Sequence, residues 1–470
     1  MLFTRRAVTA AALMLATALS LLTGCAAPSA KSSMSDSSAT YPPIVFVHGN
    51  GDSAALWLTT LWRFESNGWP RERLHVIELP YPLARDNDSK AQPGRSGTAE
   101  HMAYLKGEVE RVLRSNGASQ VVLMGNSRGG YAIRNYIQNG GAATVSHAVL
   151  GGTPNHGVWA IQGYNEGSEF SGTGAFLKGL NAPKNANGDE VTSPVRWMTV
   201  RSDKNDKYAQ PDGLWIGAKG TPTNVGYDGP ELMGARNVVI AGLDHRETSF
   251  APTAFAAAFE FLTGRAPKVD IVPEAQVALS GVVTGLGLNP NDPASGDYVN
   301  NLPLAGAELS IYETDAATGQ RLGAPVYTRK TGPDGRWGPF SPRAGVTHEF
   351  ELKATGYATT HFYRSPFPRS SSILNLRPER VTAAADKEAQ ALVIFTRPRG
   401  YFDAQRDTLR FDGRTPPPGV PPAGAGVSSS RLRLDNAADR AITAEFNGER
   451  LAGRVWPAAA GHVSVLELTY

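Results

Sequence analysis

The sequence predicts an α/β domain with a mostly parallel sheet, followed by an all-β region. Two patterns predict this order. From 41 to 267, short apolar runs alternate with helical segments, which is typical of a parallel sheet covered by helices on both faces. Beyond that point, apolar and polar residues alternate within strands that Gly, Pro and Asp turns separate. We expect a β-sandwich-like or barrel domain at 268–380 and a further all-β region at 381–470.

Short apolar runs mark the expected strands of the first domain, because the strands of a covered parallel sheet are buried on both faces. A helix is expected at 99–116, where apolar residues recur at helical spacing until Gly117 ends it. A last helix is expected at 252–262. The expected strands are 44–47, 74–79, 121–124, 148–150, 195–200 and 238–240.

Strands with alternating residues mark the second region, which also contains a turn at 331–335 and a Pro/Gly loop at 415–426. Alternation alone does not separate a barrel from a sandwich, so both remain open. The expected strands are 307–312, 348–352, 392–395, 431–434, 441–446 and 463–468.

The bulk composition narrows the classes of partner. The chain has 470 residues, of which 41% are hydrophobic, enough for two or three domains of ~150 residues each. Its net charge of +3 is too small to indicate nucleic acid or an anionic membrane surface as a partner. The sequence has no zinc-type Cys/His cluster, no P-loop and no nicotinamide-type Gly pattern, so we expect no cofactor and no metal. The oligomeric state stays open.

The N-terminus is typical of an exported protein. Arg5 and Arg6 precede an uncharged stretch at 7–22, which is short of the ~20 residues that span a bilayer comfortably. Leu-Thr-Gly-Cys at 22–25 then resembles a bacterial lipobox. Cys25 is the only cysteine in the chain, which excludes an intramolecular disulfide. An ordinary secretory signal with an incidental cysteine is the alternative.

The resemblance to bacterial lipoproteins implies that 1–25 is a signal segment, cleaved before Cys25, which then carries a lipid. It implies a membrane-anchored protein in the periplasm or at the cell surface. Ala26 after the cysteine suits outer-membrane sorting if the host is Gram-negative. The Ala/Ser-rich stretch at 26–40 is expected to be a flexible tether.

The motif Gly-Asn-Ser-Arg-Gly at 125–129 is the strongest functional signal. It follows the apolar run 121–124 and precedes a helical segment at 130–138. Gly-x-Ser-x-Gly between a buried strand and a helix is typical of a nucleophile elbow, a tight turn that exposes the serine hydroxyl. The small residues two before and two after the serine let the backbones pass closely. The motif predicts Ser127 as a nucleophile, although the pentapeptide alone is a weak signal.

A serine hydroxyl needs a base within hydrogen-bond reach, and the base needs an orienting carboxylate. Around an elbow of this type the chain order is Ser, then acid, then His. His147 lies at the wrong end of its strand, whereas His245 follows the strand 238–240 and precedes the last helix. We therefore predict His245 as the base, and expect His156 to stabilise a loop near the site.

An oxyanion hole needs two backbone N–H groups. The N–H of Arg128, directly after the nucleophile, is the first expected donor. The second is the N–H of Asn50, in the loop that follows the first strand and begins His48-Gly49. His48 itself is expected to be structural.

These motifs together resemble bacterial and archaeal lipases of the α/β-hydrolase superfamily, over 41–264. The matching pieces are Val-His-Gly at 47–49, the elbow at 125–129, an aspartate frame at 206–211 and Asp-His at 244–245. Similarity also extends to an archaeal lipase with an N-terminal hydrolase domain and a C-terminal β-barrel for lipid binding. The segments that carry this second similarity are 259–264, 270–273 and 362–365.

The acid is the least certain member of the expected triad. The archaeal lipase has an aspartate where this chain has Gly151-Gly152, so the acid must come from the loop after 195–200. Asp203 and Asp206 both lie there. Lipases often place the acid shortly before a small apolar residue and a proline, which favours Asp206.

The resemblance implies a serine hydrolase of carboxylic esters, a lipase or esterase acting on acyl glycerols or other long-chain esters. A polyester depolymerase or a thioesterase would use the same residues, and a non-catalytic envelope or surface-binding lipoprotein with a hydrolase fold is the alternative from another class. The Gly/Asn-rich stretch 155–192 is either a lid or a packed excursion. Because the triad precedes 269, we expect the chemistry to survive removal of the second region if the first domain folds alone.

Overall fold

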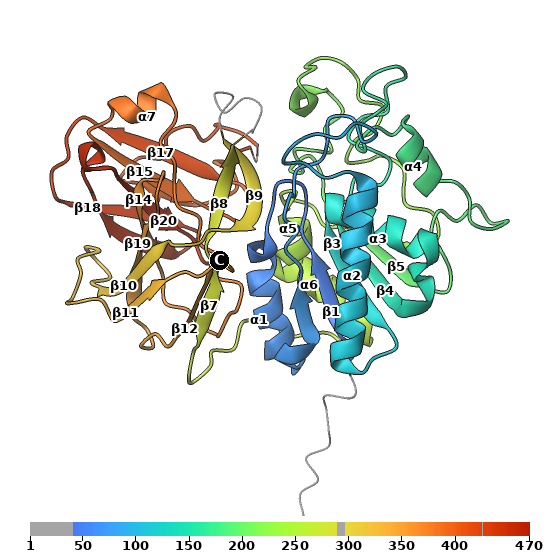
Figure 1. The fold of residues 1–470 in the computed structure, drawn as a ribbon. Coiled ribbons are helices and arrows are strands. Elements are labelled where there is room, and N and C mark those ends of the chain that lie inside the picture. The colour runs from blue at the N-terminus through green and yellow to red at the C-terminus, as the bar shows by residue number, and fades with distance from the viewer. Residues whose placement is uncertain (1–40, 289–296, 425) are drawn as a thin grey trace, which may run out of the picture. The chain divides into compact units, whose positions relative to one another are not determined.

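The computed structural model describes residues 41–288, 297–424 and 426–470, and the predicted lipidation site Cys25 lies outside them. The first domain is built on a six-stranded sheet with the order β2-β1-β3-β4-β5-β6, parallel throughout (Figure 1). This confirms the predicted fold class. The strands are β1 (Ile44–Val47), β2 (Leu74–Val76), β3 (Val121–Asn126), β4 (Val145–Gly151), β5 (Arg196–Arg201) and β6 (Arg236–Val239).

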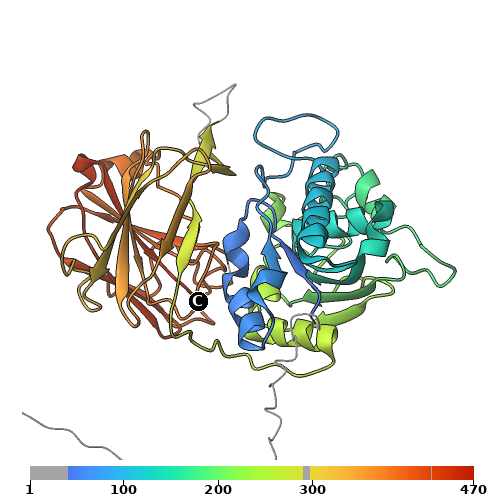
Figure 2. The same cartoon turned by 60° about the horizontal axis from the view of Figure 1, so that its bottom comes forward.

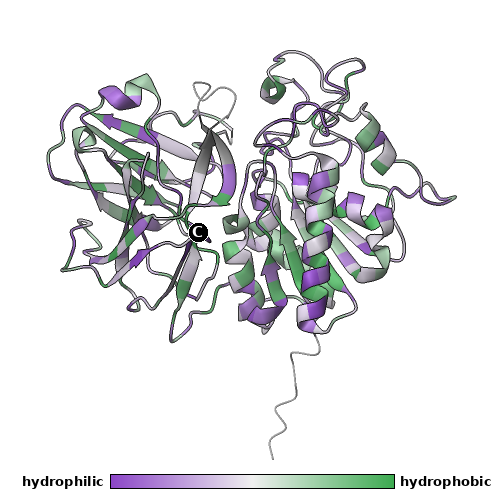
Figure 3. Cartoon of the chain, viewed as in Figure 1, coloured by the Kyte–Doolittle hydropathy of each residue, from purple (hydrophilic) through white to green (hydrophobic). Residues whose placement is uncertain are grey.

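Helices cover both faces of this sheet (Figure 2). Side chains alternate along a strand, so Val45 and Val47 of β1 pack with helices α2 and α3, whereas Ile44 and Phe46 pack with α1 and α6. The hydropathy colours mark the strands of the sheet as hydrophobic (Figure 3). The helices are α1 (Leu58–Ser66), α2 (Thr98–Asn116), α3 (Arg128–Tyr136), α4 (Ala175–Leu180), α5 (Glu247–Phe250), α6 (Pro252–Thr263) and, in the second region, α7 (Ala384–Glu388).

The second region, residues 268–470, is called the β region below. Its largest sheet has seven strands in the order β11-β10-β13-β14-β20-β15-β17. Smaller sheets pair β12 with β7, β8 with β9, and β18 with β16 and β19. The strands are β7 (Leu279–Val282), β8 (Thr284–Leu288), β9 (Asp297–Pro303), β10 (Glu308–Thr314), β11 (Tyr327–Lys330), β12 (Arg336–Phe340), β13 (Thr347–Lys353), β14 (Thr359–Arg364), β15 (Ala391–Thr396), β16 (Leu409–Phe411), β17 (Ser429–Leu434), β18 (Ala441–Phe446), β19 (Glu449–Arg454) and β20 (His462–Glu467).

Most strands of the β region pair antiparallel, as their alternating residues lead one to expect. The exception is β20, which lies between β14 and β15 and pairs with both in parallel. The two stretches that the sequence analysis separates at residue 380 therefore share one sheet.

Helix α1 connects the first domain to the β region. Its residues Leu58 and Trp62 are each 1% exposed and belong to the hydrophobic core of the β region. The Trp62 indole N–H donates to the Ser370 carbonyl at 2.9 Å. Nearby, the Asn301 side-chain amide donates to the Asp52 carbonyl at 2.9 Å. The two regions thus share a core as well as hydrogen bonds.

Within the described ranges, no helix is long and apolar enough to cross a membrane.

Candidate active site

Ser127 occupies a sharp turn between β3, which ends at Asn126, and α3, which begins at Arg128. Its φ of 50° and ψ of −122° lie in a region that a residue with a side chain rarely adopts. Such strain persists only where the surroundings enforce it, and it concentrates at functional sites. The turn is the nucleophile elbow geometry that the motif predicts.

The glycines on either side of Ser127 are required by close backbone contacts. A Cβ on Gly129 would lie 2.5 Å from the Val47 carbonyl oxygen, and one on Gly125 would lie 2.7 Å from Cδ1 of Ile133. Both distances are far below van der Waals contact. Helix α3 therefore packs directly on β1 and β3 only because glycine stands at these positions.

His245 and Asp206 form a hydrogen-bonded pair. The two Asp206 carboxylate oxygens lie 2.8 and 3.0 Å from Nδ1 of His245, and both residues are about 95% buried, with 4% and 5% of their surfaces exposed. Asp203 instead accepts the backbone N–H of Asn205 at 3.0 Å and caps its own turn. Of the two candidate acids, the structure thus places Asp206 beside the predicted base.

The three predicted residues follow the carboxyl ends of parallel strands. Ser127 follows β3, Asp206 lies in the loop after β5, and His245 lies in the loop after β6. The Asn126 side-chain amide also donates to the His245 carbonyl at 3.3 Å, which ties the elbow to the histidine loop. In the described part of the chain no hydrogen bond joins the Ser127 hydroxyl to His245, but both line one cavity.

That cavity, called the Ser127 cavity below, has a volume of about 230 Å³. Part of its wall is apolar and comes mainly from the excursion between β4 and β5. Another part is polar or aromatic and comes from the loop after β1, from the Asp206 and His245 loops, and from the β region. The apolar wall comprises Val158, Trp159, Tyr164, Phe170 and Ile216, and the other wall comprises Asn50, Asp52, Tyr208, Arg246 and Tyr401.

Asn50 and Arg128, the predicted oxyanion donors, are held by one neighbouring loop. The Asn50 side chain accepts the Ala84 N–H at 2.7 Å. The Arg128 guanidinium donates to the Pro82 carbonyl at 3.1 Å and to both carboxylate oxygens of Glu169 at 2.7 and 2.8 Å. The Arg128 side chain is fully buried. The sequence indicated a role only for the Arg128 backbone N–H. It did not predict the ion pair between Arg128 and Glu169.

His48 has the structural role that we expected. Its Nε2 accepts the Leu79 N–H at 3.1 Å. Burial lowers its pKa, and the charges of Arg128 and Arg377 act in the same direction, while Asp52 and the Gly49 carbonyl oppose them. The imidazole is therefore kept neutral beside the loop that carries Asn50.

Two family models match the chain. Residues 41–179 match the model of class 2 lipases, and residues 275–381 match the model of the lipase C-terminal domain. The first match lies in the parallel-sheet domain and the second lies in the β region. Both models are of lipases, which confirms the resemblance to lipases inferred from the motifs and supports a hydrolase that acts on esters.

Solved structures with detectable similarity include bacterial lipases and esterases. The Bacillus licheniformis lipase BlEst2 in its propeptide form is 14% identical, covers 88% of this chain and 92% of its own, and has a TM-score of 0.35. The mature form of BlEst2 is 18% identical over 47% of this chain and 92% of its own, with a TM-score of 0.33. The esterase RhEst1 from Rhodococcus sp. ECU1013 is 19% identical over 47% and 90%, with a TM-score of 0.29. No curated protein matches this chain.

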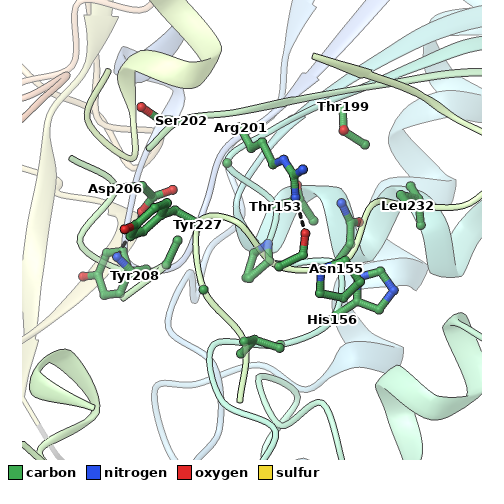
Figure 4. A pocket seen from close by; sticks show the side chains of 18 of the residues that line it. Thr153, Asn155, His156, Thr199, Arg201, Ser202, Asp206, Tyr208, Tyr227 and Leu232 are labelled. Carbon is green, nitrogen blue, oxygen red and sulfur yellow. Dashed lines mark hydrogen bonds between the residues drawn. The ribbon is translucent and has the colours of Figure 1, made fainter. Parts of the chain in front are cut away.

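A smaller cavity of about 80 Å³ lies behind the Asp206–His245 pair. Figure 4 shows Asp206 toward one end of it and His156 toward the other, with the Arg201 guanidinium donating to the Gly229 carbonyl at 2.6 Å. His156 pairs with Glu190 at 3.0 Å. It has the loop-stabilising position that we expected and lies apart from the nucleophile.

Two residues of the β region reach the site, and the sequence analysis missed both. The Arg397 guanidinium donates to the Asp244 carboxylate at 2.9 Å, beside His245. Tyr401 lines the Ser127 cavity. No local motif marks either residue, because each reaches the site through the packing of a separate region.

One cluster in the described residues offers metal-ligating atoms. Glu349, Glu351 and His361 come from β13 and β14 and are buried. Arg321 binds the carboxylates of Glu349 and Glu351 at 2.6 and 2.7 Å. Lys353 also pairs with Glu351 at 2.6 Å, so the cluster is an internal ion-pair network of the β region.

Proposed function

We propose that this chain is a serine hydrolase of carboxylic esters, with Ser127 as nucleophile, His245 as general base and acid, and Asp206 as the residue that orients His245. The observation that carries the proposal is the Asp206–His245 hydrogen bond of 2.8 Å next to a cavity that also holds the strained Ser127. The lipase family models over both regions support the reaction class.

The proposed reaction proceeds in two halves. Ser127 Oγ attacks the ester carbonyl carbon while His245 Nε2 takes the hydroxyl proton. The N–H groups of Asn50 and Arg128 donate hydrogen bonds to the developing oxyanion. When the tetrahedral intermediate collapses, the C–O bond to the alcohol breaks and His245 protonates the leaving oxygen. Water then attacks the acyl-enzyme with the same proton transfers in reverse order, releasing the acid and free Ser127.

The apolar part of the Ser127 cavity favours esters with an apolar acyl group, such as acyl glycerols and other long-chain esters. Val158, Trp159 and Phe170 offer a surface without charge on which an acyl chain can pack. Burial of each methylene contributes ~0.8 kcal/mol. The part of a long chain that exceeds the cavity would lie along its open mouth.

The test is covalent labelling of the nucleophile. A fluorophosphonate probe is expected to modify Ser127, as mapped by peptide mass spectrometry, and to abolish turnover of chromogenic esters. Ser127→Ala is expected to fold normally and lose ~10⁴ to 10⁶ of the turnover rate. A folded Ser127→Ala protein that keeps more than about a tenth of the activity would remove Ser127 as the nucleophile.

We further propose that Cys25 carries a lipid that anchors the protein to a bacterial membrane, facing the periplasm or the cell surface. The support is the Leu-Thr-Gly-Cys pattern at 22–25 and the absence of any other cysteine from the sequence. Cys25→Ser is expected to move the protein from the membrane fraction to the soluble fraction and to abolish incorporation of a labelled fatty acid, with unchanged ester turnover. Retention of the variant in the membrane would contradict this anchor.

A further inference from the structure

We infer that the β region completes the active site, with Tyr401 determining specificity for the alcohol part of the ester and Arg397 positioning Tyr401. This inference rests on the proposed ester hydrolysis at Ser127. Both residues lie outside the segments that match the lipase family models, which end at 381.

Tyr401 touches the loops of two proposed triad members at once. It is 7% exposed and lines the Ser127 cavity. The Lys207 ammonium lies 3.7 Å from the centroid of its ring, and the Arg246 guanidinium lies 5.0 Å from it. Cations at these distances are attracted to the face of an aromatic ring. Because Lys207 directly follows Asp206 and Arg246 directly follows His245, one ring bridges the two loops.

A buried ionic contact fixes the position of Tyr401. The Arg397 guanidinium donates to the Asp244 carboxylate at 2.9 Å, to the Tyr401 carbonyl at 2.7 Å and to the Glu247 carboxylate at 2.6 Å. The Tyr401 N–H donates to the same Asp244 carboxylate at 2.7 Å. Asp244 is fully buried and Arg397 is 4% exposed. Arg397 thus holds the Tyr401 backbone against the loop that carries His245.

The reaction requires the alcohol part of the ester to lie against the part of the Ser127 cavity that Tyr401 forms. His245 must return its proton to the leaving oxygen, so the alcohol has to lie beside the imidazole. The Tyr208 ring packs edge-on against the His245 ring with centroids 4.7 Å apart. Lys207 contacts the rings of both Tyr208 and Tyr401, which places Tyr401 next to that position. The acyl chain is left with the apolar wall that includes Phe170.

Two series of esters separate the two parts of the cavity. The first keeps a butyryl group and varies the alcohol from methyl to naphthyl, and the second keeps p-nitrophenol and varies the acyl group from acetyl to dodecanoyl. Tyr401→Ala is expected to raise kcat/KM for bulky relative to small alcohols at least about tenfold while leaving the acyl preference unchanged. Tyr401→Phe keeps the ring and is expected to resemble the wild type. Phe170→Ala is the matched variant, expected to change the acyl preference instead.

The role of Arg397 is tested by the same ratio of kcat/KM for bulky relative to small alcohols. A general loss of stability would lower both values and leave this ratio unchanged. Arg397→Met is expected to shift the alcohol preference in the direction of Tyr401→Ala, because Tyr401 loses its anchor, and Arg397→Lys to restore part of it. Arg440→Met is the control. Arg440 makes a two-bond contact with Asp412 at 2.8 Å that is partly exposed and lies wholly inside the β region, so its loss should leave the ratio unchanged.

The outcomes separate this inference from the proposed function. If the wild type is not labelled by fluorophosphonate at Ser127, the proposed function fails first. If Tyr401→Ala is labelled normally but its alcohol ratios stay within about twofold of the wild type, the inference is overturned. A change confined to the acyl series overturns it as well. Tyr401→Leu provides the same comparison should the alanine variant not fold.

Discussion

The two regions of this chain build the candidate site in different ways. The parallel sheet delivers Ser127, Asp206 and His245 at the ends of β3, β5 and β6, so their positions follow from the topology alone. The β region delivers Arg397 and Tyr401 from a loop after β15, through packing against the first domain. Sequence motifs therefore indicate the groups proposed to react, and the structure adds the groups that hold them.

Removal of the β region should have the largest effect on stability and activity of all the changes considered, because the two regions share a core. The sequence alone let us expect that the chemistry would survive, but the interface changes this expectation. Truncation would expose Leu58 and Trp62, each 1% exposed in the whole chain. It would also remove Arg397 and Tyr401, which hold the Asp244 carboxylate beside His245.

We expect a protein that ends at residue 267 to aggregate or melt well below the full chain, and to lose turnover of acetyl as well as long-chain esters. Thermal unfolding and assays with p-nitrophenyl acetate and palmitate check this. A folded truncated protein that hydrolyses acetyl esters like the full chain would show that the β region serves only long substrates.

Inside the first domain, the next largest expected effect is the difference in kcat between variants of the two candidate acids, Asp206 and Asp203. Asp206→Asn should lower kcat by ~10⁴, because an amide cannot hold His245 in the required tautomer. Asp203→Asn should be milder, since Asp203 pairs with Ser202 and with the backbone N–H groups of Asn205 and Gly242 rather than with His245. Steady-state kinetics of the two variants side by side decide the assignment. A larger loss for Asp203→Asn would be incompatible with the geometry described here.

The sheet of the first domain could be predicted from sequence because its strands are continuous apolar runs. All six were expected, although β2 ends at Val76 rather than at 79. The Ile77 N–H still bonds the Phe46 carbonyl of β1, but the Leu79 N–H bonds the His48 side chain instead of a neighbouring strand. Helix α3 begins at Arg128, earlier than the expected 130, because the elbow leads directly into it.

The pairing of the β region could not be predicted in the same way. The sequence indicated β10, β13, β15, β17, β18 and β20 but not the other strands of this region. Moreover, β20 inserts between β14 and β15, and the Phe362–Val465 contact joins residues far apart in the chain. Alternation fixes which face of a strand is buried and does not fix its neighbour. For the same reason Arg397 and Tyr401 carried no signal, whereas the spacing around Ser127 did.

Two ion pairs sharpen the comparison between interior and surface contacts. Arg128 and Glu169 are 0% and 2% exposed, so Arg128→Met should lower the free energy of unfolding by ~3–5 kcal/mol, because Glu169 is left buried and unpaired. Arg71, with 46% of its side chain exposed, joins Glu65 to Glu274 at the surface. Arg71→Met should cost ~0–1 kcal/mol. Urea denaturation measures both values, and equal costs would contradict the assigned difference in burial.

The smallest expected effect is a pH dependence at the boundary between the regions, where Glu78 accepts the Ala54 N–H and the Asn375 side-chain amide. Burial raises the pKa of Glu78 from 4.5 to about 7, against the opposing Ala54 hydrogen bond and the Arg377 charge. The folded protein thus keeps a proton that the unfolded chain loses near pH 4.5, so the contribution of Glu78 to stability is full below that pH and disappears as the pH rises to about 7.

Glu78→Gln removes this titration. Between pH 5 and 7, the Tm of the variant should therefore fall less than the Tm of the wild type, and the two falls should differ by about 2–4 °C or less.

Asp315 supplies a control of opposite sign. Hydrogen bonds from Thr318 lower the pKa of Asp315, so its contribution is present at neutral pH and is lost as the solution is acidified below its usual range. Asp315→Asn should therefore matter at pH 7 and not below pH 3. Thermal unfolding across pH 3 to 8 compares the three proteins, and a Tm of Glu78→Gln that falls in parallel with the wild type would show that Glu78 is ionised throughout.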